Sequence, residues 1–356
     1  MKRFVLLLLA PLLLCAGCGL WKDHPPLEAV EAAQTIGLDR TEGTRMSVTT
    51  GSDADAERLE AEAETLALAL DALRGRSEHG GLFFGHTQYL LLGEAYARDG
   101  IQPLLDLTAR SAELRLLTPI YVLRGTAADA VLSEELDVTA RLAALARTGL
   151  PACTALEAAD RLARSGCALL GAVRYDPEAQ TLTPDGCAVL RGGRLAGYLD
   201  ADCAGAAAWR AGKGGAPVSL ADGVTLAVES CSVHAHAAWQ DGRPTALTLT
   251  LEADALVDQL PEGVRITDAR SRAKLERSLA ETMAARTADA IRQTQALGAD
   301  ALALGDLVAG RYPLRWRGCA GDWAALFPTL PIRVEAAAHI TGTQDLGDPL
   351  PEEGGA

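Results

Sequence analysis

The most restrictive feature of this sequence is that its single long apolar run lies at the N-terminus. Lys2 and Arg3 provide a positive start, residues 4–16 are uninterrupted apolar sequence, and the small residue Gly17 precedes Cys18. This is the pattern of a secretory signal with a cleavage site. The run fits the roughly 7–15 residues of a signal h-region and falls short of the roughly 20 that span a bilayer. We therefore expect residues 1–17 to be a signal peptide and the remainder to fold as a globular body outside the cytoplasm.

The residues around Cys18 resemble the bacterial lipoprotein box, in which a cysteine follows two small residues. The resemblance implies that Cys18 carries a thioether-linked diacylglycerol and becomes the mature N-terminus. One acyl chain binds a membrane only marginally, whereas two chains, at about 0.8 kcal/mol per buried methylene, anchor a domain stably. Residues 18–34, which include Trp21 and two consecutive prolines, would then form a lipid-anchored tether. The alternative is a secreted protein without the lipid.

Length and charge narrow the class of protein further. With 356 residues and roughly 150 per domain, two or three domains are expected. The formal net charge is −14. An acidic surface repels phosphates, so we expect no nucleic-acid partner.

The first third of the chain predicts a small sheet covered by helices. Residues 35–39 and 46–50 are typical of two short strands around a turn, and a helix is expected from Ser52 or Asp53 to Gly75. A strand over 82–92, a helix over 101–110, a strand over 116–123 and a helix over 126–147 follow. The strand, helix and strand at this spacing favour a crossover unit with two parallel strands.

The middle of the chain is rich in glycine and cysteine. Residues 187–190 and 194–199 flank Gly192 and Gly193, which is a two-residue hairpin signal. A helix over 201–211 leads to the glycine-rich stretch 212–215, a plausible linker.

The last third has the most regular pattern. Strands are expected over 224–239 and 244–256, joined through Asp241 and Gly242 as an antiparallel hairpin with one solvated face. From Asp268 a long helix is expected to pack across this sheet, because one stripe of it is apolar. That stripe contains Leu275, Leu279, Met283, Thr287 and Ile291. Residues 331–340 alternate again and should return to the same sheet.

These patterns predict an α+β fold with three mixed α/β domains, each a small β-sheet with packed helices. The C-terminal sheet is expected to be largely antiparallel and to carry one long helix. We place the N-terminal α/β domain at 35–150, the middle domain at 151–215, the C-terminal domain at 216–343 and a disordered tail at 344–356.

The sequence lacks the common catalytic signatures, including the G-x-S-x-G elbow, the Walker loop, G-x-G-x-x-G after a strand and H-E-x-x-H. We therefore predict no enzyme activity, no catalytic residue and no cofactor. His234 and His236 lie on one face of a predicted strand and would bind zinc or copper only if a third ligand such as His339 came near. An exposed pair on the solvated face is the favoured interpretation, and no metal site is predicted.

Other candidate groups also have plainer interpretations. His79 and His86 are expected to be structural, because no motif supplies a partner for acid-base work. The aromatic residues Trp316, Trp323 and Phe327 either bind a ligand or, as we expect, pack between the long helix and the last strand. A run of carboxylates lacks the EF-hand spacing and is interpreted as a solvated helix face; it contains Asp53, Asp55, Glu57, Glu60, Glu62 and Glu64.

Six cysteines remain after Cys15 and Cys18 are set aside. In an exported chain they could form disulfides, or they could be buried free thiols, and the sequence does not choose between these. Their spacing does not match zinc signatures. They are Cys153, Cys167, Cys187, Cys203, Cys231 and Cys319.

Two blocks of sequence carry a family resemblance. The first is LFFGHTQYLLLGEAYARDGI at 82–101, followed by LDLTAR at 105–110 and PIYVLRG at 119–125. The second is QALGADALALG at 295–305, followed by Trp316, residues 323–327 and a closing strand that ends at Gly342. In this order and spacing, together with the lipoprotein box, they resemble the C subunits of spore germinant receptors, the Ger(x)C lipoproteins.

The resemblance implies three mixed domains anchored by a diacylglyceryl, palmitate-type lipid to the outer face of the spore inner membrane. It implies a receptor in which this subunit joins an A and a B integral membrane subunit, and in which small nutrients trigger germination. No catalytic residues come with the family. Nutrient recognition belongs to the B subunit by this resemblance, so an assembly or signalling role is expected here.

The alternative function is that of an extracytoplasmic solute-binding lipoprotein of a transporter. Such proteins usually have two larger lobes of alternating strands and helices, and the predicted C-terminal hairpin argues against that architecture. An envelope hydrolase without a recognised motif is a third possibility, and it would require a cleft with converging titratable groups.

Overall fold

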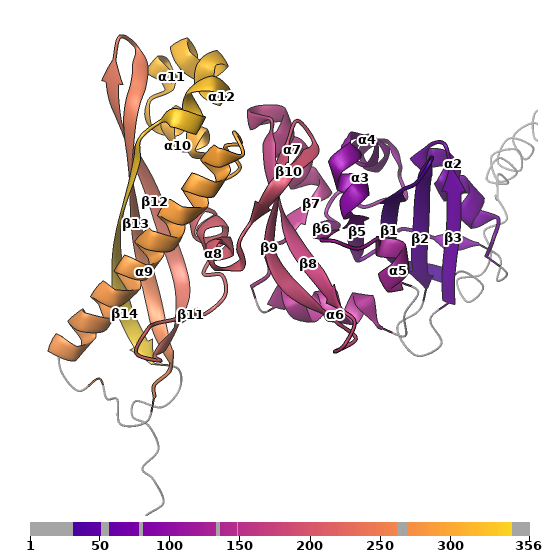
Figure 1. Ribbon diagram of the computed structural model, residues 1–356, viewed down its shortest axis with the longest axis horizontal. Coiled ribbons are helices and arrows are strands. Elements are labelled where there is room, and N and C mark those ends of the chain that lie inside the picture. The colour runs from indigo at the N-terminus through magenta and orange to yellow at the C-terminus, as the bar shows by residue number, and fades with distance from the viewer. Residues whose placement is uncertain are drawn as a thin grey trace, which may run out of the picture.

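The computed structural model describes residues 31–50, 57–77, 81–132, 136–147, 149–261, 266 and 269–343. Within them the chain forms two β-sheets with helices, and Figure 1 shows the sheets lying side by side with helix α8 (Ala201–Arg210) between them. The signal, Cys18 and the 344–356 tail lie outside the described residues. Most of the expected 18–34 tether does too, but its last four residues belong to a strand that begins at Glu31.

The first sheet has ten strands, and parallel strands form its centre. Its order is β10-β9-β8-β6-β5-β1-β2-β3, with β4 beside β1 and β7 beside β6. The pairs β1·β5, β5·β6 and β6·β8 are parallel, as the crossover signal predicted for β5 and β6, and the outer pairs are antiparallel. The strands are β1 (Glu31–Arg40), β2 (Thr44–Thr50), β3 (Glu57–Ala63), β4 (Leu82–Phe83), β5 (Tyr89–Gly93), β6 (Pro119–Leu123), β7 (Cys153–Thr154), β8 (Cys167–Asp176), β9 (Thr181–Arg191) and β10 (Arg194–Leu199).

Helices cover both faces of this sheet (Figure 1). On one face pack α2 (Leu66–Arg74), α3 (Glu94–Asp99), α4 (Gln102–Arg110) and α7 (Ala155–Ser165), and on the other pack α5 (Ala128–Leu132) and α6 (Val138–Arg147). The central strand β5 shows why both faces are apolar. Leu90 and Leu92 join the core on the first face and Leu91 joins the core on the second, since side chains alternate along a strand.

The second sheet has the order β11-β12-β13-β14. Its strands are β11 (Val218–Ser219), β12 (Thr225–Gln240), β13 (Arg243–Gln259) and β14 (Ile332–Thr343). The predicted hairpin of β12 and β13 is confirmed, and β14 returns to the sheet as expected, parallel to β13. Helix α9 (Ala269–Ala296) crosses the sheet and buries the predicted stripe of Leu275, Leu279, Met283, Thr287 and Ile291.

Short helices follow α9 and close one end of the second sheet. They are α10 (Leu304–Arg311), α11 (Pro313–Cys319), η2 (Ala320–Asp322), α12 (Trp323–Leu326) and η3 (Phe327–Thr329). Pro313 begins α11, where a proline is tolerated because the first N–H of a helix has no intrahelical acceptor.

The expectation of one small sheet per domain is wrong for the first two predicted domains. Strands from residues 31–123 and from 153–199 belong to one continuous sheet, because β8 pairs directly with β6. The residues of β8 to β10 also share a hydrophobic core with the second sheet. That core joins Cys187 and Val189 to Trp209 of α8, Leu249 of β13 and Leu279 of α9. The domain boundaries themselves stay a prediction, and the sheets do not follow the first of them.

The expected helix from Ser52 or Asp53 to Gly75 is wrong in its first part. Residues 57–63 form β3, and only α2 is helical. Leu59 and Ala61 are buried while Glu60 is exposed, so the true period is two. Pairing with β2 overrides the weak β-propensity of this Glu- and Ala-rich segment.

Two further elements are divided where a single one was expected. The strand expected over 82–92 is two strands, β4 and β5, which both pair with β1. The helix expected over 126–147 is α5 and α6, and residues 133–135 between them lie outside the described residues. Both β4 and β5 run parallel to β1, and residues 84–88, which include a turn at Gly85 and His86, separate them.

Candidate functional site

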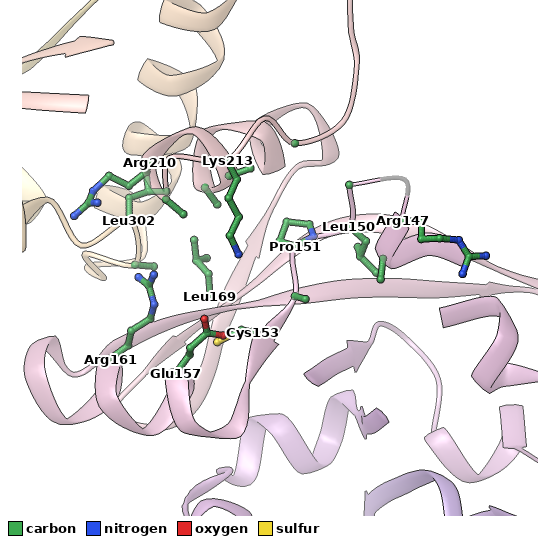
Figure 2. A pocket seen from close by; sticks show the side chains of 18 residues that line it. Arg147, Leu150, Pro151, Cys153, Glu157, Arg161, Leu169, Arg210, Lys213 and Leu302 are labelled. Atoms are coloured by element: carbon green, nitrogen blue, oxygen red, sulfur yellow. The ribbon is translucent and has the colours of Figure 1, made fainter. Parts of the chain in front are cut away.

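A cavity with several positive side chains lies where the first sheet meets α8 and the loop before α10. This cavity of about 320 Å³ is lined by residues from the end of α6, from β7, α7, β8, α8 and the glycine-rich loop after α8, and by Ala301 and Leu302. Figure 2 shows Lys213 extending into this cavity from the loop and Arg161 extending into it from α7. Leu169 and Leu302 supply apolar wall.

Helix α7 positions the lower wall of this cavity through its N-terminal cap. Thr154 accepts a hydrogen bond from Glu157 N through its side chain, and Glu157 Oε2 accepts one from Thr154 N at 2.8 Å. This capping box satisfies backbone donors at the start of the helix. The same capping box engages the carboxylate of Glu157, which is the only acidic side chain that lines the cavity. Glu157 is therefore held at the start of α7.

Helix α8 and its following loop form the upper wall. Trp209 donates its indole N–H to Gly214 O at 2.9 Å, and Lys213 N donates to Ala208 O at 2.9 Å. These bonds fasten the loop that carries the Lys213 side chain. Arg210 donates from Nη2 to Ala303 O at 2.9 Å, which ties α8 to the segment before α10.

The electrostatics of the cavity reflect this crowding of positive charge. Burial lowers the pKa of Arg210, and repulsion from Arg161 lowers it further. Burial raises the pKa of the Cys153 thiol to about 12; Glu157 adds to the rise, while Arg161 and Lys213 oppose it. Arg161 therefore acts on both Arg210 and Cys153, and Lys213 acts on Cys153. Sequence reasoning missed Arg161, Arg210 and Lys213, and it interpreted the stretch around Lys213 as a linker only.

A second hollow, of about 460 Å³, lies at the end of β1 and involves the first family block. Asp39 accepts hydrogen bonds from Ala128 N at 2.8 Å and Asp129 N at 2.7 Å, so it caps the start of α5. A Cβ at Gly93 would lie 1.9 Å from Asp39 Oδ1. Burial raises the pKa of Asp39, and the two backbone N–H groups oppose this. Asp39 and Gly93, which lies in the first family block, therefore have a structural role.

Asp129 lines the same hollow and binds polar and positive side chains of the neighbouring strands β2 and β3. Ser47 Oγ donates to it at 2.8 Å, Arg45 Nη1 donates at 3.2 Å, and Arg58 forms an ion pair with it. Burial acts to raise the pKa of Asp129, but the bonds from Ser47 and Arg58 outweigh burial and hold the pKa below its ordinary value. The negative charge of Asp129 is therefore balanced by Arg45 and Arg58.

The second family block is organised around one buried carboxylate. Asp300 is 5% exposed and accepts from Leu304 N at 2.8 Å, Gly305 N at 2.7 Å and Trp323 Nε1 at 2.8 Å. Gln295 Nε2 donates to Phe327 O and to Leu330 O, both at 2.8 Å. The signature residues thus hold α10, α12 and the end of α9 together.

The aromatic residues pack as predicted. The rings of Trp316 and Trp323 meet edge to face with centroids 5.2 Å apart, and Phe327 lies 6.0 Å from Trp323. Trp323 and Phe327 are buried in the hydrophobic core that α9 shares with the second sheet. Core packing accounts for this cluster.

The histidines also have the plainer interpretation. His234 and His236 are exposed on β12, opposite Thr250 and Thr248 of β13. His339 is exposed too, but it pairs with Asp254, several residues along the sheet. Across the described part of the chain no three His, Cys, Asp or Glu side chains could hold a metal ion. His86 is exposed beside the ring of Phe83, and His79 lies outside the described residues.

The carboxylate run is not a helix face. Glu60 and Glu62 lie on β3, where Glu62 accepts from Arg45 at 3.0 Å. Asp53 and Asp55 lie outside the described residues, and Glu64 is exposed in the turn before α2.

All six remaining cysteines are buried free thiols, which decides the alternative that the sequence left open. Burial raises the pKa of Cys187 to about 12 and the pKa of Cys167, Cys203 and Cys231 to about 11. Such thiols carry almost no thiolate at neutral pH and are poor nucleophiles.

The predicted attachment residue Cys18 lies outside the described residues, so lipidation stays a prediction. Among the helices of the described residues, none is long and apolar enough to cross a membrane.

Two protein-family models match the chain. The model described as "Spore germination protein N-terminal domain" matches residues 23–145. The model described as "Spore germination B3/GerAC like, C-terminal" matches residues 185–344. The two matched regions contain both sequence blocks that carried the resemblance.

Among solved structures, the chain is similar to the one titled "Crystal Structure of the GerBC protein". The TM-score is 0.59 at 16% sequence identity, over 86% of this chain and 96% of that one. At this identity the likeness shows a shared fold. No curated protein sequence matches the chain. The two family models, placed in order along most of the sequence, show that the chain belongs to the GerAC-like family of spore germination proteins.

Proposed function

We propose that the chain is a non-enzymatic, lipid-anchored subunit of a nutrient germinant receptor, required for assembly or signalling when nutrients trigger spore germination. The observation that carries the proposal is the family membership, together with the lipoprotein box that ends at Cys18. The contacts of Asp39, Gly93, Asp300 and Trp323 support a scaffold role, because these residues are occupied in holding the fold.

The proposed location is the outer face of the spore inner membrane, with the lipid on Cys18 as anchor. The proposed partners are an A and a B integral membrane subunit. The strand β1 begins at Glu31. A chain reaches at most about 3.3–3.6 Å per residue, so a short tether keeps both sheets close to membrane partners.

The anchor is tested by changing Cys18 to Ala and labelling the cells with a fatty acid. The wild-type chain should carry the label and sediment with membranes, and the variant should carry none. Cys15→Leu is the matched control, because it removes the neighbouring cysteine, leaves Cys18 in place and should keep the label. Labelled Cys18→Ala protein would contradict this anchor.

Assembly is tested by cross-linking in intact spores that contain a tagged copy of the chain. Peptides of the two integral receptor subunits should be enriched with this chain and absent with an unrelated tagged spore lipoprotein. Equal recovery with both baits would contradict the receptor proposal. Tight binding of a neutral nutrient by the purified chain alone would instead favour the solute-binding alternative.

A further inference from the structure

The cavity of about 320 Å³ beside α7 and α8 has a charge opposite to that of the molecule that contains it. Three cationic side chains, Arg161, Arg210 and Lys213, line it together with one carboxylate, Glu157, while the whole chain has a formal net charge of −14. Figure 2 shows Arg161 and Lys213 extending into the cavity, whereas Arg210, which binds Ala303 O, and Arg147 lie at its edges with their guanidinium groups directed away from Lys213. The sign of the charge in the cavity is therefore opposite to that of the chain as a whole.

These cations have no ion-pair partner among the residues that the structure describes. Arg164, one turn further along α7, pairs with Asp160 at 2.8 Å, and several other arginines of the described chain also form ion pairs. In contrast Arg210 Nε is buried without a hydrogen-bond partner. Glu157 supplies one negative charge against the three positive ones, so it neutralises the cluster only in part.

The acidic side chains near the cavity do not balance its positive charge. A smaller adjoining hollow of about 220 Å³ shares Glu157, Arg161 and Arg210 and adds Asp160 and Asp306. Asp160 is paired with Arg164. Asp306 and the buried Asp300 attract Arg210, but neither lies within ion-pair distance of it in the described structure. The positive charge of the cavity is therefore only partly compensated.

The arrangement is suited to a small ligand. The volume falls at the lower end of the roughly 300–1,000 Å³ of small-molecule sites. Lys213 and Arg161 extend into it from opposite walls, and the hydrogen bonds of Trp209 and of Lys213 N hold the upper wall in place. Guanidinium groups bind carboxylate and phosphate oxygens in pairs, and an ammonium adds a point charge.

We propose that this cavity binds a small multivalent oxyanion, which carries phosphate or carboxylate groups, between Arg161, Arg210 and Lys213. The bound anion would bridge α7 of the first sheet to α8 and the loop before α10, since these elements supply the three cations. It would therefore stabilise the junction between the two sheets. This inference does not depend on the receptor proposal.

The test measures anion binding by calorimetry to the full chain, purified in detergent. Inorganic phosphate and citrate are the two probes, and sodium chloride at matched ionic strength is the reference, because screening alone stabilises an acidic protein. We expect saturable binding of at least one probe. Phosphate binding alone identifies a phosphate site, citrate binding alone identifies a polycarboxylate site, and both results support the proposal.

Two variants locate the site. Lys213→Met and Arg161→Gln should each weaken binding by about tenfold or more, the usual loss for a charge-assisted hydrogen bond. The matched controls are Lys274→Met and Arg270→Gln, which remove the same charges from the exposed part of α9 and should leave binding unchanged. Lys213 is exposed, so its variant should fold normally.

Two results would overturn the proposal. One is that calorimetry at millimolar probe concentration detects no saturable binding of phosphate or citrate to the wild-type chain above the sodium chloride reference. The other is that the cavity variants bind as tightly as the α9 controls, which would place the anion elsewhere. A failure of either kind would leave the family membership and the receptor proposal unaffected.

Discussion

At the scale of single residues, the family blocks are explained by close contacts and buried carboxylates. Gly93 is required because Asp39 Oδ1 occupies the space where a side chain would begin, while that oxygen caps α5. Asp300 has the same relation to α10. The sequence showed Gly93 and Asp300 as part of a resemblance, but it could not show that Asp39 contacts Gly93 and Ala128 or that Asp300 binds Trp323, since these partners are far apart in the chain.

Gly93→Ala should destabilise the protein by about 1–3 kcal/mol, the usual cost of overpacking, because its Cβ would lie 1.9 Å from Asp39 Oδ1 and 3.3 Å from Ala128 N. Urea unfolding measures this. Gly310→Ala is the control, since a Cβ there meets nothing within 4 Å and Ala favours a helix. Equal effects of the two substitutions would show that the Asp39 contact is unimportant.

Asp129→Asn should lower stability at neutral pH by about 1.5–3 kcal/mol, because it removes charge-assisted bonds to Arg45 and Arg58. The pKa of Asp129 is held below its ordinary value of 3.8 in the folded chain. Its contribution is therefore full above about pH 4 and is lost as pH falls through the lower folded pKa.

The measurement is the unfolding free energy of wild type and Asp129→Asn from pH 7 to pH 2. The difference in unfolding free energy between the two chains should narrow only in the acid range. Asp160→Asn, which alters an exposed pair with Arg164, should give a small difference throughout. A wild-type advantage over Asp129→Asn that stays constant to the lowest pH would contradict the assigned ion pairs.

At the scale of elements, regular patterns were predictable and irregular ones were not. The α9 stripe and the hairpin of β12 and β13 follow from periodicity, and both are confirmed. Strand β3 was missed because its leucine and alanine spacing also fits a helix, and only pairing with β2 decides between them. The basic cavity was missed because its lining comes from separate segments with no common local signal.

Asp300→Ala should cost about 2–4 kcal/mol, because it removes the cap of α10 and leaves the buried N–H groups of Leu304, Gly305 and Trp323 without an acceptor. Tryptophan fluorescence during urea unfolding would follow it. Asp306→Ala, in the exposed first turn of the same helix, should cost under about 1 kcal/mol. Similar losses from both would mean that charge near the helix matters and the buried bonds do not.

At the scale of the whole molecule, the fold class could be predicted but the joining of its parts could not. An α+β chain with two mixed sheets and a long helix is what the structure shows. The sequence placed separate sheets on either side of Pro151, whereas β8 pairs with β6 across that point. Parallel pairing between distant strands leaves no local mark, so sequence reasoning divided one sheet.

The shared core predicts cooperative unfolding of the two sheets. Four of the five tryptophans lie in α8 or in the part of the chain that follows it, at 209, 239, 316 and 323. Tryptophan fluorescence therefore reports the unfolding of α8 and the second sheet, while circular dichroism reports both sheets. Because residues of β9 and α8 pack into the core of the second sheet, the two transitions should coincide in urea. Two separated midpoints would show that the sheets unfold independently.

The measurement that tests the central claim most directly is nutrient germination of spores that lack this chain and every paralogous C subunit. The fall in optical density after nutrient addition should be lost, restored by the wild-type gene and not by the Cys18→Ala form, while a receptor-independent trigger still works. Normal nutrient germination without the chain would contradict its role as a receptor subunit.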